Sequence, residues 1–198
     1  MVAKSSEKRP TLDGHLTDDC WKNAINLHSG TTLCVAYDND YVYLGVTVPN
    51  HQLQSQLTEQ TSAQFSYGNQ SVSERSENGQ SGSSSPRDQS LLSQDRLRIG
   101  IDIDQDLLST MELQVTAAGK VHDAIDGCEN WQPTWYPAIQ SNEVSTTFEI
   151  AILRRDLSTL PITHSETWLI SVSCLNAGQR NATEIIPNPD RLIRVLFQ

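Results

Sequence analysis

The chain has 198 residues, of which 37% are hydrophobic, and its 14 basic and 24 acidic residues give a formal net charge of −10 at pH 7. This length favours one domain with a substantial core, and the acidic balance disfavours nucleic acid or an anionic membrane surface as partner, because phosphate binding needs clustered Lys and Arg. No apolar run approaches the length of a membrane span, and no apolar segment follows the basic N-terminus as it would in a secretory signal.

Residues 1–9 are expected to be a flexible N-terminal segment, and the stretch PTLDGHLTDDCW that follows predicts the first compact structure. Asp13-Gly14 is a dipeptide typical of tight turns. Thr17 is expected to cap a short helix, and the acidic residues after it suit the positive end of that helix. Trp21 would then plug one open end of a β-sandwich, so this stretch is framework rather than a binding site.

Alternation of apolar and polar residues, typical of half-buried strands, begins near Thr31. Strands are expected over residues 33–37, 42–48, 97–103, 111–115, 148–152, 168–174 and 191–197. The first two flank an Asp38-Asn39-Asp40 turn, which predicts a β-hairpin. Strands with one apolar face, separated by turns, predict antiparallel sheets packed face to face. We therefore expect an all-β fold, an antiparallel two-sheet β-sandwich that forms a single domain over residues 10–198.

A low-complexity segment lies between the hairpin and the third expected strand. Residues from about 54–93 are rich in Ser, Gln, Asn and Gly and contain few large apolar side chains. Such a segment cannot bury enough surface to offset the entropy lost on ordering. We interpret it as a disordered or loosely packed insertion, which a loop tolerates because the entropy of loop closure grows slowly with length.

The side chains that could support catalysis or zinc binding are dispersed along the chain. The five histidines form no H-E-x-x-H motif and no nucleophile lies beside a recognisable base, so we expect turn or exposed histidines and assign no catalytic activity. The four cysteines, Cys20, Cys34, Cys128 and Cys174, do not have the spacing of zinc ligands. They are either free structural thiols or include one disulfide.

Three aspartates alternate with other residues in DIDQDLLSTMEL. Asp102, Asp104 and Asp106 repeat as the oxygen ligands do at the start of a calcium loop. The sixth position of that pattern is Leu107 instead of glycine, and the twelfth is Leu113 instead of a bidentate glutamate. Two interpretations remain: a Ca²⁺ site, or a solvated strand face with Asp106 in the following turn.

Two stretches carry groups suited to saccharide recognition. NWQPTWYPAI contains Trp131, Trp135 and Tyr136, whose ring faces could stack on sugars, although aromatic rings more often pack in the core. We expect Trp135 to be packed and Trp131 to be more exposed. SCLNAGQRNATE offers Asn176 and Arg180, which can hydrogen-bond hydroxyl groups. The candidate carbohydrate-binding residues are thus Trp131, Tyr136, Asn176 and Arg180.

The order of PTLDGHLTDDCW, VAYDNDYVYLGVTV, QDRLRIGIDID, ELQVTAAGKVHD, TWYPAI and TTFEIAIL resembles the family 9 carbohydrate-binding modules and their relatives in the DOMON-like β-sandwich group. The resemblance covers nearly the whole chain outside the insertion. It departs from the family pattern at Leu153, where a proline is expected. The matching positions, most of which we interpret as framework, are Asp13, Gly14, Trp21, Asp38, Tyr43, Asp95, Trp135 and Glu149.

This resemblance implies a non-catalytic accessory domain that binds a poly- or oligosaccharide, with calcium as a structural ion. It also implies an extracellular or periplasmic location and contact with other domains, if the chain is a piece of a larger protein. One alternative is a structural or protein-interaction domain without a sugar ligand. Another is haem binding, as in a different branch of the group, with Met111 or His122 as the candidate axial ligands.

Overall fold

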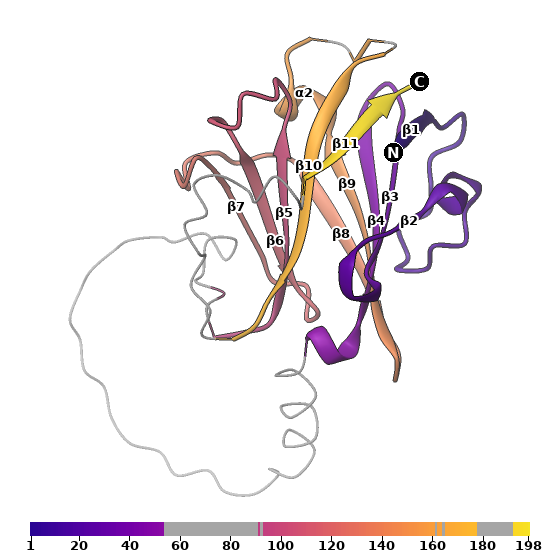
Figure 1. The fold of residues 1–198 in the computed structure, drawn as a ribbon, viewed down its shortest axis with the longest axis vertical. Helices are drawn as coiled ribbons and strands as arrows, with labels where there is room; N and C mark the ends of the chain where they lie inside the picture. The colour runs from indigo at the N-terminus through magenta and orange to yellow at the C-terminus, as the bar shows by residue number, and fades with distance from the viewer. Residues whose placement is uncertain (54–90, 92, 161, 164, 178–191) are drawn as a thin grey trace, which may run out of the picture.

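The computed structural model describes residues 1–53, 91, 93–160, 162–163, 165–177 and 192–198, and most of their regular structure is β-strand (Figure 1). The strands are β1 (Val2–Ser5), β2 (Ile25–Asn26), β3 (Thr32–Tyr37), β4 (Tyr41–Pro49), β5 (Arg96–Asp102), β6 (Met111–Thr116), β7 (Val121–Ile125), β8 (Trp135–Ser141), β9 (Ser145–Leu153), β10 (Thr167–Leu175) and β11 (Leu192–Phe197). The short helices are η1 (Asp19–Asn23), η2 (His28–Gly30), η3 (Asn50–Gln52) and α2 (Arg154–Leu157). The all-β prediction is confirmed, and the insertion predicted at 54–93 lies almost wholly outside the described residues. In the part of the chain described, no helix is long and apolar enough to cross a membrane.

The strands join into one curled, mixed sheet in the order β7-β6-β5-β10-β11-β1-β3-β4-β9-β8, with β2 beside β3. The sequence predicts two purely antiparallel sheets, but β1 joins them into one sheet and pairs with both of its neighbours in the parallel sense. Val2 and Ala3 pair with β11, and Lys4 and Ser5 pair with β3, both in the parallel sense. The segment 1–9, predicted to be flexible, therefore contains the strand that links the two halves of the sheet, and Ala3 is fully buried there.

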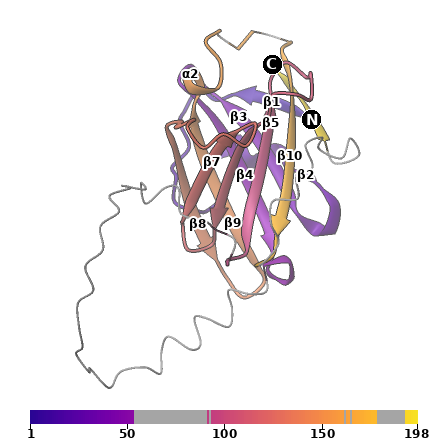
Figure 2. The ribbon, with the colours of Figure 1, turned by 90° about the vertical axis from the view of Figure 1, so that its left-hand side faces the viewer.

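The main core lies between the two halves of the curled sheet. Figures 1 and 2 show the half with β5, β6, β7 and β10 facing the half with β3, β4, β8 and β9. Alternate residues of these strands point inward, as the period-two pattern predicts. The inward side chains that form this core include Leu33, Val35, Val42, Leu44, Val46, Leu97, Ile99, Ile101, Leu113, Phe148, Ile150, Trp168 and Ile170.

The β-hairpin predicted around Asp38 is confirmed as β3 and β4. One carboxylate oxygen of Asp38 accepts hydrogen bonds from the backbone N–H groups of Asp40 and Tyr41, each at 2.7 Å. The other oxygen accepts the Tyr43 hydroxyl at 2.7 Å and the Arg9 Nε–H at 3.1 Å. Burial opposes ionisation of Asp38, yet these donors outweigh burial and lower the pKa of its carboxyl group. The turn is thus held by an ionised side chain.

A second, smaller hydrophobic cluster covers the outer face of β3, β4 and β9. Its buried members are Trp21, Cys34, Ala36, Tyr43 and Ala151. Trp21 lies directly over Gly45, because a Cβ atom built on Gly45 would approach the indole ring to 2.9 Å and Leu16 to 2.7 Å. The prediction that Trp21 is buried framework is confirmed. Its predicted place at an open end of the core is wrong, because the N-terminal segment packs across the outside of the sheet.

The Asp13-Gly14 turn is anchored to the same outer face by a buried carboxylate. The backbone N–H groups of Asp13 and Gly14 both donate to Glu149 Oε2, at 2.8 and 2.7 Å. Gly14 has φ of +84°, and a Cβ atom there would lie 2.8 Å from the backbone nitrogen of Gln140. Glycine is therefore required by the left-handed backbone and by the close approach to β8.

The short helix η1 starts later than the sequence predicts. Its N-cap is Asp18, and no side chain makes a capping hydrogen bond there. The Asp18 carboxylate instead accepts the backbone N–H of Thr11 at 2.9 Å, which ties η1 to the preceding turn. The predicted capping role of Thr17 is wrong, because the chain closes this loop through Asp18.

Candidate functional site

The described residues form a groove where the two halves of the sheet separate. β1 pairs with β3 only at Ala36 and Tyr37 and with β11 only at Leu196 and Phe197. Towards the other end of these strands, β2 and η2 border one side and β10 and β11 border the other. The space between them is a groove of about 980 Å³. Its existence follows from the shortness of β1, which holds the halves together at one end only.

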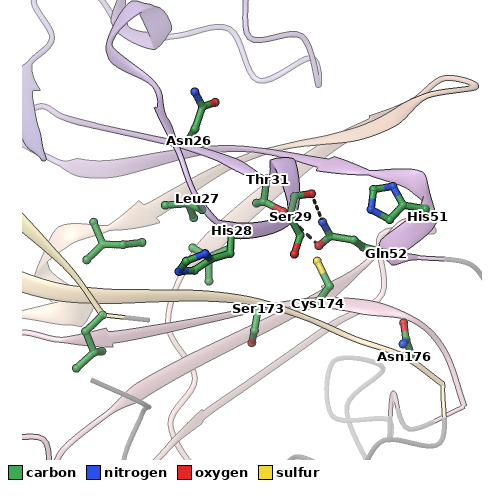
Figure 3. Close-up of a pocket in the computed structure, with 13 residues that line it drawn as sticks. Asn26, Leu27, His28, Ser29, Thr31, His51, Gln52, Ser173, Cys174 and Asn176 are labelled. Atoms are coloured by element: carbon green, nitrogen blue, oxygen red, sulfur yellow. Dashed lines mark hydrogen bonds between the residues drawn. The ribbon is translucent and has the colours of Figure 1, made fainter. Parts of the chain in front are cut away.

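One wall of the groove is built from η2, η3 and the residue that follows η2. The Gln52 side chain donates through Nε2 to the Ser29 carbonyl at 2.6 Å, and its Oε1 accepts the Thr31 hydroxyl at 3.3 Å (Figure 3). Ser29 has φ of 62°, which bends η2 into the groove wall. His28 and His51 are exposed beside these residues. Hydrogen bonds between the two turns therefore hold this polar wall in a defined shape.

The floor and the opposite wall come from β10, β11 and Leu27, the residue before η2. Leu27, Val172, Cys174 and Ile193 line the floor and pack against the main core. Ser173 and Asn176 border the groove, and Figure 3 shows them across from η2 and η3. Burial, followed by the nearby negative charge of Asp95, raises the pKa of the Cys174 thiol to about 12. The thiol is therefore neutral at physiological pH and acts as part of an apolar floor.

The described lining of the groove combines hydrogen-bonding side chains with apolar ones. Among the described residues that line the groove there is no Asp, Glu, Lys or Arg. The polar groups are instead amides, hydroxyls and imidazoles, which can donate and accept hydrogen bonds to neutral molecules. The described residues that line the groove are Asn26, Leu27, His28, Ser29, Thr31, His51, Gln52, Val172, Ser173, Cys174, Asn176, Leu192 and Ile193.

Of the four predicted carbohydrate contacts, Asn176 lies at this groove. Arg180 lies outside the described residues. Trp131 is at the opposite end of the fold. It follows β7, and the end of β7 lies level with the end of β5, because Met111 pairs with both Ile101 of β5 and Ile125 of β7. Asn176 follows β10, whose end pairs with the start of β5. The structure therefore does not bring Trp131 and Asn176 together.

Tyr136 lies on the outer face of β8, away from the groove. Its neighbour Trp135 points inward, is 3% exposed and donates through Nε1 to Asp123 at 2.8 Å, as expected for the packed tryptophan. Tyr136 is 51% exposed, and its ring centre lies 6.5 Å from that of Tyr41. The Arg9 guanidinium sits 5.2 Å above the Tyr41 ring. The contact between Arg9 and Tyr41 therefore helps to hold the N-terminal segment on the sheet.

The three predicted calcium ligands do come together at the end of β5 and in the loop that follows it. Asp102, Asp104 and Asp106 each offer a carboxylate oxygen within 4.8 Å of the others. Asp102 also accepts the backbone N–H groups of Gln105 at 2.8 Å and Leu107 at 3.0 Å, which close the loop. Burial raises the pKa of Asp102, and repulsion from Asp104 adds to that effect. An all-oxygen donor set of this kind fits Ca²⁺, and the cation would relieve the repulsion.

The two candidate haem ligands point in different directions. Met111 pairs with Ile101 and packs against the main core, so it lies on the inner face of the sheet. His122 pairs with Gln114, whose partner Arg98 lies on the outer face. The two side chains cannot ligate one iron atom from opposite faces.

Comparison with known proteins identifies the fold. No protein-family model matches the sequence, and neither does any curated protein. A family 9 carbohydrate-binding module from Caldicellulosiruptor kristjanssonii, solved with cellotriose, matches with a TM-score of 0.55 and 13% identity over 100% of this chain and 94% of that one. A complex with glucose gives a TM-score of 0.55 and 13% identity, covering 100% and 96%. The chain has the fold of the family 9 carbohydrate-binding modules.

A candidate carbohydrate-binding protein from Bacteroides uniformis ATCC 8492 also matches this chain, with a TM-score of 0.58 and 7% identity over 100% of this chain and 98% of that one. At such identities the likeness concerns the arrangement of strands. It confirms the resemblance expected from the sequence strings.

Sequence reasoning missed the wall formed by Ser29, Gln52 and His51. Their positions in the family 9 fold depend on two turns, η2 and η3, that are far apart along the chain. The available signals were the Ser29-Gly30 turn dipeptide and the Pro49 that ends β4. Both mark turns, but neither shows that the two turns lie side by side.

Proposed function

We propose that this chain is a non-catalytic saccharide-binding domain whose ligand lies in the groove between η2, η3 and the ends of β10 and β11. The observation that carries the proposal is the groove lining, which combines uncharged hydrogen-bonding groups with an apolar floor. A volume of about 980 Å³ lies within the usual range of small-ligand sites and accommodates a short oligosaccharide. Two solved structures with the same fold hold cellotriose and glucose.

The proposed contacts follow from the chemistry of each wall. Asn176 offers donors and acceptors for sugar hydroxyls on one side, and Ser29 and His51 offer them on the other. The apolar floor suits the C–H faces of a pyranose ring. Arg180 follows Asn176 by four positions and remains a predicted contact, whereas Trp131 and Tyr136 lie elsewhere and are not part of the proposed site.

The lining also supports a binding role over a hydrolytic one. Glycoside hydrolysis generally uses a pair of carboxyl groups on either side of the scissile bond. The described residues that line the groove include no carboxyl group, and the Cys174 thiol is held neutral by burial. We therefore propose that a saccharide is bound and released unchanged.

Isothermal titration with glucose and cello-oligosaccharides tests the proposal. Asn176→Ala removes a side-chain hydrogen bond and should weaken binding about 2–13-fold, because such a bond contributes roughly 0.5–1.5 kcal/mol. Asn39→Ala is the matched control, since Asn39 is an exposed amide in the β3–β4 turn at the other end of the fold. It should leave the affinity unchanged.

Two results would count against the proposal. An equal change of affinity in Asn176→Ala and Asn39→Ala would mean that the saccharide does not bind in the groove. No heat of binding with any neutral saccharide, in protein shown to be folded by circular dichroism, would favour the alternative of a structural or protein-interaction domain.

A further inference from the structure

Two cysteines meet where the N-terminal segment packs on the outer face of the sheet. Cys34, on β3, is fully buried, and its thiol donates to the backbone carbonyl oxygen of Cys20 in η1 at 3.4 Å. Cys20 packs against the outer hydrophobic cluster that contains Cys34. All four cysteines are free thiols in the structure. The backbone of one cysteine thus lies in contact with the thiol of the other.

Solvent reaches this pair from the side of Cys20. A surface hollow of about 520 Å³ is lined by Cys20, Asn23, Thr17 and the first residues of the chain. Cys20 is partly exposed, whereas Cys34 lies behind it under η1. Lys4 and Lys8 line the hollow together with Glu7, Asp18 and Asp19, so its charge is mixed. Cys20 is therefore the partner nearer to solvent, and Cys34 is the shielded one.

We propose that Cys20 and Cys34 are a redox pair in which Cys20 reacts first, with a small-molecule disulfide at the hollow, and Cys34 resolves the adduct, giving a disulfide that joins η1 to β3. The structure then describes the reduced form of a site with two stable states. The proposal is independent of saccharide binding, because the pair lies on the outer face and the groove opens between the two halves of the sheet.

The chemistry needs a small-molecule disulfide such as oxidised glutathione as oxidant. The Cys20 thiolate attacks one sulfur of that disulfide, forming a mixed disulfide and releasing one glutathione thiolate, which takes up a proton. The Cys34 thiol then loses its proton and attacks the Cys20 sulfur, expelling the second glutathione. Two protein thiols are oxidised to one disulfide, and one glutathione disulfide is reduced to two thiols.

The surroundings of the two thiols make this reaction slow at neutral pH. Burial, followed by the negative charge of Asp18, raises the pKa of Cys20 to about 12, and burial also raises the pKa of Cys34. Since the thiolate is the attacking species, the rate of adduct formation should rise about tenfold for each pH unit between roughly pH 7 and 9.

The test uses the full chain with Cys128 and Cys174 changed to serine, so that only the pair can react. After incubation with oxidised glutathione, intact mass should fall by two hydrogen atoms, and non-reduced peptide mapping should show Cys20 joined to Cys34. The linked protein should melt about 6–12 °C higher than the reduced protein, because the bond closes a loop of about 15 residues. Saccharide affinity should be the same in both forms.

Variants separate the two roles. With Cys34→Ser added, the reaction should stop at a glutathione adduct on Cys20, and with Cys20→Ser added, Cys34 should stay unmodified. If Cys34→Ser lowers folding by circular dichroism, Cys34→Ala takes its place. Persistence of a Cys20 adduct while Cys34 is present would overturn the proposal. So would a linked protein that melts below the reduced one, because the bond would then not fit the fold.

Discussion

Truncation of Trp21 should separate stability from ligand binding in this fold. Trp21 is 4% exposed and lies on the outer face of the sheet over Gly45, whereas the groove opens between the two halves. Trp21→Ala removes the largest side chain of the outer cluster without touching a groove residue. The free energy of unfolding should fall, while the saccharide affinity of the folded protein should be unchanged.

The size of the stability loss depends on how little the neighbouring side chains can move into the space left by Trp21. A buried tryptophan removes about 150–250 Å² from water, which corresponds to roughly 4–6 kcal/mol as an upper bound. Gly45 beneath the ring has no side chain to fill the space, and Leu16, which also lies over Gly45, belongs to the same segment as Trp21. We therefore expect Trp21→Ala to lower the free energy of unfolding by about 3–5 kcal/mol.

Urea unfolding followed by circular dichroism measures this loss. Tyr136→Ala is the control, because Tyr136 lies on the outer face of the same half and is 51% exposed. Its loss should be about 1 kcal/mol or less. A loss below about 1 kcal/mol for Trp21→Ala would refute the packing argument. A changed saccharide affinity of the folded fraction would refute the separation of framework and groove.

Three further predictions concern single features of the fold. Burial raises the pKa of Glu149 although the Asp13 and Gly14 N–H groups oppose this, so its contribution to stability is full below about pH 4.5 and is lost as pH rises through the folded pKa. Glu149→Gln should therefore gain stability relative to the natural chain as pH rises, and urea unfolding over a pH series that shows a constant difference would contradict this. Gly14→Ala should cost about 1–3 kcal/mol more than Gly127→Ala, because both have positive φ but only Gly14 meets the backbone of β8; equal losses on unfolding would exclude the steric argument. Calcium should raise the melting temperature of the natural chain and not that of Asp106→Asn. Identical melting curves of the natural chain with calcium and with a chelator would show that no calcium ion binds at Asp102, Asp104 and Asp106.

The local features of the fold could be predicted from the sequence. The alternation in residues 33–48 and the Asp38 turn predict the β3–β4 hairpin, because both signals act over a few residues. The spacing of Asp102, Asp104 and Asp106 likewise brings their carboxylates together within one loop.

The long-range features could not be predicted in the same way. β1 contains only Val2–Ser5, half of it polar, and its position is decided by parallel pairing with β3 and with β11 near the opposite end of the chain. No local pattern encodes such pairing. The groove depends on it, so Asn176 could be proposed from its residue type, but Gln52 and Ser29 could not be placed opposite it.

The most direct test of the account is an NMR titration of the isotopically labelled chain with cellotriose. The groove proposal predicts that the amide signals of Ser29, Gln52, Ser173 and Asn176 shift in a saturable way, while those around Trp131 and Tyr136 stay in place. Saturable shifts centred on Trp131 or Tyr136, or no shifts at millimolar cellotriose, would contradict it.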